Sequence, residues 1–462
     1  MKIRRSISVA SVLLLLAAAG VAGIYLTNRR EVTTSSAAAY HAFQRGFQNE
    51  QRFYKKEARV DYARAIELDP EFAEAMLGLA RQADREQALS LIERAWTLRD
   101  RLTEREKLHV DMQRSGLSHN REEALRLAKT LHEKYPGDIM AIQVLASVET
   151  DQGHADKAVE LYKELLKVDP NYAAAYNNIG YAYGYRGDYE KAIENFQKYQ
   201  FMAPDQANPF DSMGEIQAYS GHYDEAIASL QKALAIKPDF YPAYEHLGVV
   251  YEGKGDYPRA IECYEKAADL SLTNDMKEMY LLRGLRVTMW EKDSVTTEKL
   301  MQKMEAVPRS QNSEIRRLFF PAIRDLCEKH YVEAERRLVE LRPKLYAHIT
   351  GLVKDPSYKP YDPGFNLLMA KAKLGQGKDT EAIPLLEEMI HPPNSWMEFE
   401  GRLWVYTARA QLAAILARHG DLDRAEKLLA ENRKWNASWA PTREAELAVA
   451  QARSEKVNTT SK

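Results

Sequence analysis

Four prolines recur at a constant interval of 34 residues: Pro136, Pro170, Pro204 and Pro238. A fixed period of this length predicts stacked helix–turn–helix units, because each unit is too small to bury its apolar face alone. Such units stack along an axis, so a chain of 462 residues does not need one compact core. The spacing therefore predicts an all-α solenoid.

Other residues recur in phase with these prolines, and each column has a packing reason. Small residues let the paired helices approach closely, and a bulky side chain four residues after the alanine fills the gap to the next repeat. A separate glycine column supplies the left-handed residue that ends the first helix. The columns are Ala158, Ala192, Ala226 and Ala260; Gly180, Gly214 and Gly248; Tyr162, Phe196, Leu230 and Tyr264; and Gly153, Gly187, Gly221 and Gly255.

This combination of columns resembles the tetratricopeptide repeat (TPR) family. The resemblance implies a right-handed α-solenoid in which the first helix of each repeat lines a concave groove. The stretch 95–108 also resembles the opening of the membrane-tethered TPR regions of bacterial serine/threonine kinases and winged-helix regulators. The chain has no Asp-Phe-Gly and no His-Arg-Asp motif, so this resemblance implies a recognition module without the kinase or DNA-binding part.

The N-terminal residues 1–27 predict a membrane segment. An uncharged stretch of about 20 apolar residues at ~1.5 Å each would span a bilayer core of ~30 Å. Basic residues flank both ends of residues 7–26, with a slight excess before them, which favours a single-pass anchor with the solenoid on the exported side. The alternative is secretion after cleavage near the small residues Gly20-Val21-Ala22.

The strength of the repeat pattern divides the remaining chain. The frame weakens after Leu272, and three prolines with two tyrosines between Asp355 and Gly364 predict an inserted loop or a joint between two sub-solenoids. The predicted parts are a polar linker at 28–36, a regular TPR solenoid at 37–275, a degenerate helical region with a Pro/Tyr-rich loop at 276–364, C-terminal TPR-like repeats and a cap at 365–456, and a tail at 457–462.

Charge and motifs argue against several function classes. The chain has 65 Lys and Arg against 67 Asp and Glu, a balance that does not predict nucleic-acid binding. Gly248 to Lys254 resembles a P-loop, but the next residue is Gly255 and the context is helical. Cys327 and His330 lack a second ligand pair with zinc spacing. We therefore expect no catalytic residue, cofactor or metal.

The predicted binding surface follows from the phase of the first helices. An acidic surface rich in amide and tyrosine side chains suits an extended peptide with basic or neutral side chains. Four carboxylates on one face are further expected to create a continuous negative potential. The predicted groove residues are Gln143, Ser147, Asn177, Asn178, Tyr181, Tyr185, Asp211, Glu215, Tyr219, Glu245 and Glu252.

Three functional hypotheses follow. The first is a non-enzymatic, membrane-anchored scaffold that binds a protein or peptide partner in its groove. The second is a regulatory module in which a small molecule or peptide settles in the groove or in the Pro/Tyr-rich joint. The third is an enzyme with a site in residues 276–364.

Overall fold

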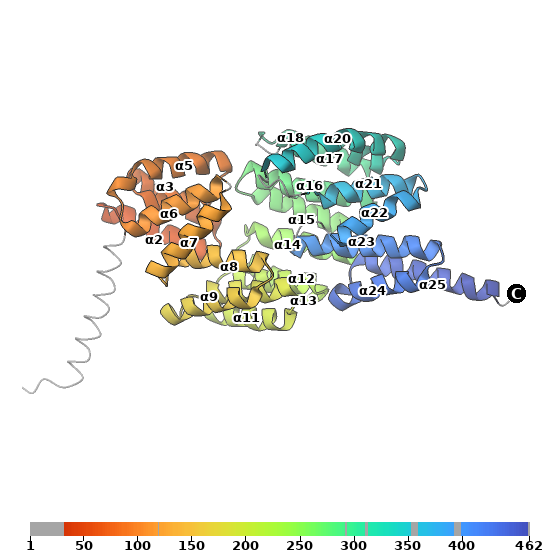
Figure 1. Ribbon diagram of the computed structural model, residues 1–462, viewed down its shortest axis with the longest axis horizontal. Helices are drawn as coiled ribbons and strands as arrows, with labels where there is room; N and C mark the ends of the chain where they lie inside the picture. The colour runs from red at the N-terminus through yellow and green to blue at the C-terminus, as the bar shows by residue number, and fades with distance from the viewer. Residues whose placement is uncertain are drawn as a thin grey trace, which may run out of the picture. The chain divides into compact units, whose positions relative to one another are not determined.

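The computed structural model describes residues 32–118, 120–291, 293–309, 313–352, 359–391 and 399–460. Every regular element in these ranges is a helix, which confirms the all-α prediction (Figure 1). The chain divides into two compact units, Met1–Ala141 and Ile142–Lys462, and the division falls inside one helix, α8 (Ile139–Asp151).

The first unit consists of antiparallel helix pairs. The second pair is shorter than the others, because its first helix has only 8 residues. Asp84 caps the second helix of that repeat by accepting a hydrogen bond from the Gln87 N–H. The helices are α2 (Ala37–Gln51), α3 (Lys55–Leu68), α4 (Ala73–Ala80), α5 (Arg85–Thr97), α6 (Glu104–Leu117) and α7 (Arg121–Lys134), with a 3-10 turn at Arg99–Arg101.

The described end of the predicted linker, residues 32–36, is bound to the repeats of the first unit. The Thr33 hydroxyl donates to Glu106 at 2.5 Å, and the Thr34 hydroxyl donates to Asp69 at the same distance. Ser36 caps α2 by accepting from the Ala39 N–H. These five residues therefore form the start of the solenoid rather than a free spacer.

The second unit begins with the regular repeats and continues through the weakly patterned region. The region 276–364, where the repeat pattern weakens, contains the regular helix α17. The helices are α9 (Ala155–Val168), α10 (Ala174–Arg186), α11 (Tyr189–Met202), α12 (Asn208–Tyr219), α13 (Tyr223–Ile236), α14 (Tyr241–Lys254), α15 (Tyr257–Leu270), α16 (Asn274–Glu291), α17 (Ser294–Glu305), α18 (Ser313–Arg317), α19 (Phe320–Cys327) and α20 (Tyr331–Leu352).

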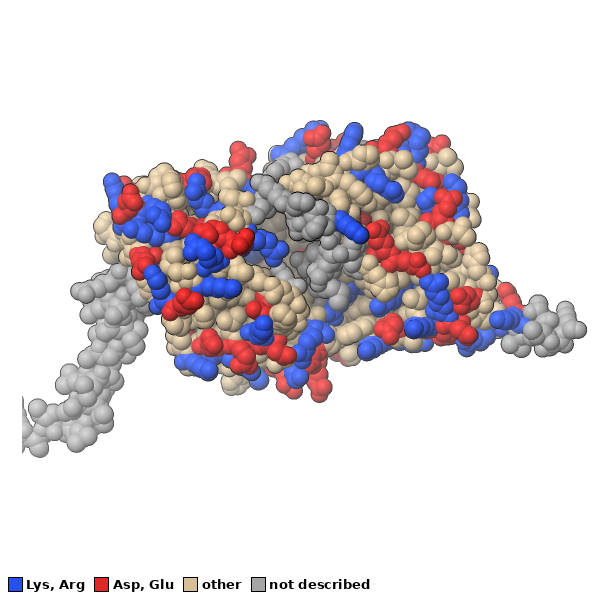
Figure 2. Space-filling view, in the orientation of Figure 1, with Lys and Arg blue, Asp and Glu red and all other residues tan. Residues whose placement is uncertain are grey.

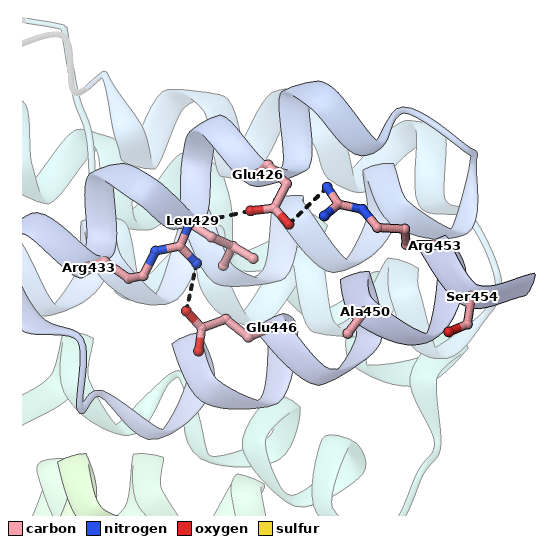
Figure 3. Close-up of a pocket in the computed structure, with 7 residues that line it drawn as sticks. All are labelled: Glu426, Leu429, Arg433, Glu446, Ala450, Arg453 and Ser454. Carbon is pink, nitrogen blue, oxygen red and sulfur yellow. Dashed lines mark hydrogen bonds and ion pairs between the residues drawn. The ribbon is translucent and has the colours of Figure 1, made fainter. Parts of the chain in front are cut away.

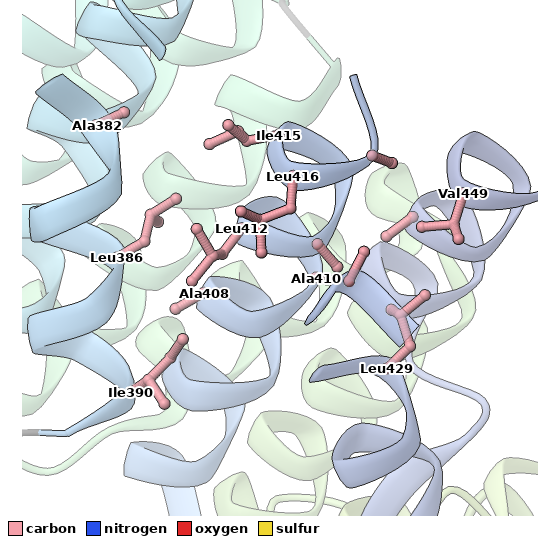
Figure 4. Close-up of a cluster of buried hydrophobic side chains, with 14 of the residues drawn as sticks. Ala382, Leu386, Ile390, Ala408, Ala410, Leu412, Ile415, Leu416, Leu429 and Val449 are labelled. Atoms are coloured by element: carbon pink, nitrogen blue, oxygen red, sulfur yellow. The ribbon is translucent and has the colours of Figure 1, made fainter. Parts of the chain in front are cut away.

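The helices at the end of the chain enclose an aliphatic core. Leu386, Leu412, Ile415 and Leu429 are buried together between neighbouring helices (Figure 4). The last helix continues to Thr460, through most of the residues predicted as a tail. The helices are α21 (Pro363–Gly375), α22 (Asp379–Ile390), α23 (Phe399–Arg418), α24 (Leu422–Asn436) and α25 (Ala440–Thr460).

The repeat columns have the roles that the sequence predicted. Gly187 ends α10 with φ +83°, and its column partners have φ between +79° and +82°. A Cβ added at Gly180 would lie 2.7 Å from the Phe196 ring, so only glycine leaves room for that ring. Ala192 is fully buried where its two helices meet.

Among the described residues, the same left-handed turn occurs twice without glycine. Phe53 has φ +59° and Lys329 has φ +63°. In both, the next residue donates its N–H to a carbonyl five residues back, from Tyr54 to Asn49 at 2.8 Å and from His330 to Asp325 at 2.7 Å. The turn geometry is therefore kept where the glycine is lost.

The C-terminal helices of the second unit contact the turns of its regular repeats. Asn436 Nδ2 donates to the carbonyl oxygens of Ala218 and Tyr219, each at 3.3 Å. A Cβ at Gly187 would lie 2.0 Å from the Trp435 ring. The junction of α24 and α25 is thus fitted to turns that lie more than 200 residues earlier in the chain.

Within the described residues, no helix is long and apolar enough to cross a membrane. The predicted membrane segment, residues 7–26, lies outside these residues.

Candidate functional site

The predicted groove lies on the first helices of the second unit, α8, α10, α12 and α14. Polar side chains on neighbouring first helices meet at separations of 34 or 35 residues, one repeat apart. Ser212 on α12 donates to Asn177 Oδ1 on α10 at 2.8 Å. One turn further along α10, the Tyr181 hydroxyl donates to Glu215 at 2.6 Å. The repeat period therefore brings these side chains into hydrogen-bond contact.

The next contact centres on a histidine between two carboxylates. His246 Nδ1 lies 2.9 Å from Asp211 Oδ1, and His246 Nε2 lies 3.6 Å from Glu215. Burial alone would lower the pKa of His246, but these carboxylates outweigh burial and raise that pKa to about 10. His246 is therefore protonated at neutral pH. Burial also raises the pKa of Glu215.

Two further carboxylates are paired with arginines of α16. Glu245 accepts from the Tyr280 hydroxyl at 2.7 Å and from Arg283. Glu252 lies 3.3 Å from Arg286. Burial would raise the pKa of Glu245, but Arg283, with His246 and Tyr280, more than offsets burial and lowers it.

These pairs correct the expected electrostatics. The sequence predicted a continuous negative potential from Asp211, Glu215, Glu245 and Glu252. The contacts reduce that negative charge, because three cationic side chains of following repeats lie beside the four carboxylates, with Asp211 and Glu215 sharing His246. On the visible face in Figure 2, acidic and basic side chains are likewise interspersed. Whether these residues bind a partner stays a prediction.

The other predicted groove residues differ in accessibility. Gln143 and Ser147 on α8 are exposed, and Asn178 on α10 is half-buried. The remaining two lie where the C-terminal helices make contact: the Tyr185 carbonyl accepts from Arg402, and the Tyr219 side chain is buried. The most accessible part of the predicted surface is therefore on α8 and α10.

A histidine in the first unit has a similar environment. His109 on α6 lies 2.7 Å from Glu74 on α4 and 2.9 Å from Asp138. Burial would lower the pKa of His109, but the two carboxylates raise it to about 10. The Glu74–His109 and Asp211–His246 pairs share a separation of 35 residues, so the contact belongs to the repeat geometry.

A cavity of about 220 Å³ lies between α16, α19, α21 and α23. Arg283 and Arg286, which pair with Glu245 and Glu252, form part of its wall. The Arg286 guanidinium also stacks on the Trp404 ring at 4.4 Å. Sequence reasoning missed this cavity, apart from the Pro/Tyr-rich joint that supplies Asp362 and Pro363. Its apolar lining is Met279, Leu282, Met289, Phe319, Ile323, Leu367 and Leu368.

A second depression, between α24 and α25, is lined by charged residues that pair with one another (Figure 3). Arg433 lies 2.9 Å from Glu446, and Arg453 lies 3.2 Å from Glu426. These ion pairs are exposed and satisfy the charges locally. The depression therefore offers no convergent set of groups for a ligand.

The cysteine and histidine considered as metal ligands are separated by burial. Cys327 is buried, with its Sγ 3.3 Å from the Thr297 hydroxyl, whereas His330 is exposed. His330 lies near Glu328 and Asp325, but Asp325 is bound by Arg337 at 2.6 Å. Exposed acidic groups of this kind do not by themselves define a metal site.

Family models of the TPR repeat match residues 146–184 and 214–255, and tetratricopeptide repeat models match 173–206 and 241–274. Residues 146–206 and 214–274 are therefore similar to TPR repeats. These matches do not bear on the resemblance to kinase-attached or regulator-attached repeats, which stays a hypothesis. No curated protein matches the sequence.

Several solved structures share local similarity. MamA is 26% identical over 34% of this chain and 93% of that chain, with a TM-score of 0.28. The APC/C assembly Cut9–Hcn1 is 15% identical over 90% of this chain and 76% of that chain, with a TM-score of 0.45. Yeast Tom70 is 15% identical over 91% and 96%, with a TM-score of 0.40. These scores are too low to support an inference about function.

Proposed function

We propose that the protein is a non-enzymatic scaffold whose TPR solenoid binds an extended peptide segment of a protein partner. The binding surface is the inner face of α8, α10, α12 and α14. The partner segment is uncharged or basic at the contact, and residues 7–26 anchor the protein in a membrane with the solenoid on the exported side.

One observation carries this proposal: polar side chains follow one another in register along successive first helices. Amide and hydroxyl groups on such a surface can satisfy the N–H and C=O groups of an extended backbone. Because the carboxylates are already paired, recognition depends on hydrogen bonds more than on net charge. Gln143, Ser147 and Asn178 are the accessible members of the surface.

The test is partner capture with Gln143→Arg and Asn178→Arg combined. Both substitutions add bulk and charge at accessible positions, so folding should be kept while capture from solubilised membranes falls. Gln197→Arg is the matched control, because Gln197 is exposed on α11, a second helix. Equal capture by the double variant and the control, measured by quantitative mass spectrometry, would overturn the surface assignment.

The anchor has a separate test. We expect intact protein from membranes to retain residues 7–26 and the repeats to be digested by protease added to spheroplasts. A mature N-terminus near residue 23 would show cleavage and secretion instead. Repeats protected from protease would show the opposite topology.

A second candidate function is regulation by a small ligand, and the cavity between α16, α19, α21 and α23 favours it. The lining of that cavity is mostly apolar with a few polar groups, as in many ligand sites. A change in α16 on ligand binding would be transmitted to Glu245 and Glu252 through their arginine partners.

A further inference from the structure

We infer that the cavity between α16, α19, α21 and α23 is an anchor pocket for one uncharged apolar side chain of the bound peptide. The inference rests on the proposed function and adds the chemistry of the side chain that fixes the peptide's register. Nothing in the repeat pattern or the family matches assigns this cavity.

The lining of the anchor pocket is adaptable and apolar. Met279 and Met289 come from α16, Phe319 and Ile323 from the start of α19, and Leu367 from α21. Methionine is flexible and polarizable, so its presence suits a pocket that accepts side chains of more than one shape. A buried aliphatic or aromatic anchor in such a pocket supplies a large share of the binding energy of an interface.

The charges around the anchor pocket exclude an ionised occupant. Arg283 is engaged by Glu245, and Arg286 is engaged by Glu252 and by the Trp404 ring. An anionic ligand would therefore compete with two existing carboxylates. Asp362 is equally engaged, because it caps α21 by accepting from the Phe365 N–H at 2.7 Å. A cationic ligand would meet the two arginines, so the complementary occupant is neutral.

The size of the anchor pocket fits one side chain. Its volume is about 220 Å³, whereas clefts for drug-sized ligands have about 300–1,000 Å³. A water molecule takes up about 30 Å³, so an apolar side chain entering the pocket would displace several waters. Burial of such a side chain removes apolar surface from water and so favours binding.

The position of the anchor pocket links it to the proposed peptide surface. One helix, α16, supplies Tyr280 and Arg283 to the polar contacts with Glu245, and it also supplies Met279 and Leu282 to the pocket. A peptide bound along the polar first helices would therefore reach the pocket when it arrives at α16. The polar contacts would bind its backbone and the pocket would select one residue.

The first test uses the full chain and small probes in saturation-transfer NMR. N-acetyl-phenylalanine amide should bind about tenfold or more better than N-acetyl-glycine amide, the factor that burial of one apolar side chain supplies. N-acetyl-phenylalanine, which carries a free carboxylate, should bind more weakly than the amide. A preference for the carboxylate would overturn the inference, because it would define an anion site.

Variants separate the anchor pocket from other apolar surface. Leu282 is half-buried in the pocket wall, so Leu282→Trp should fill the pocket without overpacking a core, and Met279→Trp is a second variant if the first is unstable. Leu447→Trp is the matched control, since Leu447 is 73% exposed on α25. Loss of probe binding in the pocket variants alone supports the inference; binding retained in both overturns it.

A peptide-display selection distinguishes failure of the inference from failure of the proposed function. Peptides selected on the wild-type chain should share one apolar position, and that preference should be lost with Leu282→Trp. If peptides are selected without any apolar preference, the scaffold proposal stands and the anchor pocket is wrong. If the probe binds but no peptide is selected, the pocket takes a free small molecule and the peptide proposal fails with it.

Discussion

The regular repeats and the C-terminal repeats of the second unit make the same turns but differ in spacing and in polarity. In the regular repeats the left-handed residues Gly153, Gly187, Gly221 and Gly255 follow one another every 34 residues. Towards the C-terminus, Gly377 and Gly420 are 43 residues apart, and α23 has 20 residues where α12 has 12. The repeat period is therefore constant in the regular repeats and variable in the C-terminal repeats.

This difference indicates which contacts fix the 34-residue period of the regular repeats. First helices of the regular repeats are joined by directional contacts, such as Ser212 to Asn177 and His246 to Asp211. A shift of one residue would break these contacts and leave buried polar groups unpaired, at about 1–3 kcal/mol each. The C-terminal helices share an aliphatic core with Leu412 and Ile415, and apolar packing tolerates helices of other lengths.

The largest expected effect is the loss of one carboxylate from the regular repeats. Asp211→Ala removes a partner of His246, both of them largely buried, and should destabilise by about 3–5 kcal/mol. Asp211→Asn keeps an acceptor and should cost less. Urea denaturation followed by circular dichroism measures both, and an unchanged midpoint for Asp211→Ala would contradict the role given to polar register.

A matched glycine pair tests the contact between the two regions. Gly153→Ala and Gly187→Ala both place a side chain in the left-handed region, at a cost of about 1–2 kcal/mol. Only Gly187→Ala also meets Trp435, where the added Cβ would lie 2.0 Å from the ring; nothing lies within 4 Å at Gly153. Gly187→Ala should therefore lower the unfolding free energy by about 1–3 kcal/mol more than Gly153→Ala does. Equal thermal melts would show that α24 does not rest on this turn in solution.

Overpacking the shared alanine column should affect both regions alike. Ala226 in the regular repeats and Ala425 in the C-terminal repeats are each fully buried. Ala226→Leu and Ala425→Leu should each destabilise by about 1–3 kcal/mol. If only Ala226→Leu is destabilising, the two regions do not share the same close helix contact.

The histidines predict a pH dependence with a defined sign. His246 and His109 each have a pKa of about 10 in the folded protein, above the usual 6.5. The stability from each is complete below pH ~6.5 and is lost as pH rises towards 10, by about 1.4 kcal/mol per pH unit. Relative to wild type, His246→Gln should flatten the decline of unfolding free energy over this window. Parallel curves for the two proteins would mean that His246 is neutral when folded.

Sequence reasoning found the features that every repeat needs for itself. The left-handed turn at Gly187 favours glycine, and the close helix contact at Ala192 favours a small residue. The same residue type therefore recurs in each of these columns, where it can be seen in the sequence. It missed the charge compensation, although Arg286 lies 34 residues after Glu252 and would have appeared had cations been aligned with the carboxylates. The anchor pocket left no comparable signal, because its walls come from four helices with irregular spacing.

The turns at Phe53 and Lys329 could not be found from the sequence either, because neither contains glycine. The turn at Lys329 gives the prediction with the smallest expected change in stability. A non-glycine residue in the left-handed region costs about 1–2 kcal/mol, whereas glycine costs about 0.5–1 kcal/mol in lost chain entropy on folding. Lys329→Gly should therefore stabilise the protein by about 0.5–1 kcal/mol. Lys329→Ala, which keeps the strain and removes the charge, is the control.

The reciprocal change in the C-terminal repeats tests whether the turn at Lys329 has the same energetics as a turn that keeps its glycine. Gly377 has φ +73° and no atom within 4 Å of an added Cβ, so Gly377→Lys would introduce the strain without a clash. Gly377→Lys should lower the unfolding free energy by about the amount by which Lys329→Gly raises it, as measured by paired thermal melts. If Lys329→Gly is neutral while Gly377→Lys is destabilising, contacts of the Lys329 side chain offset its backbone strain. The turn at Lys329 would then keep its left-handed residue without glycine and without loss of stability.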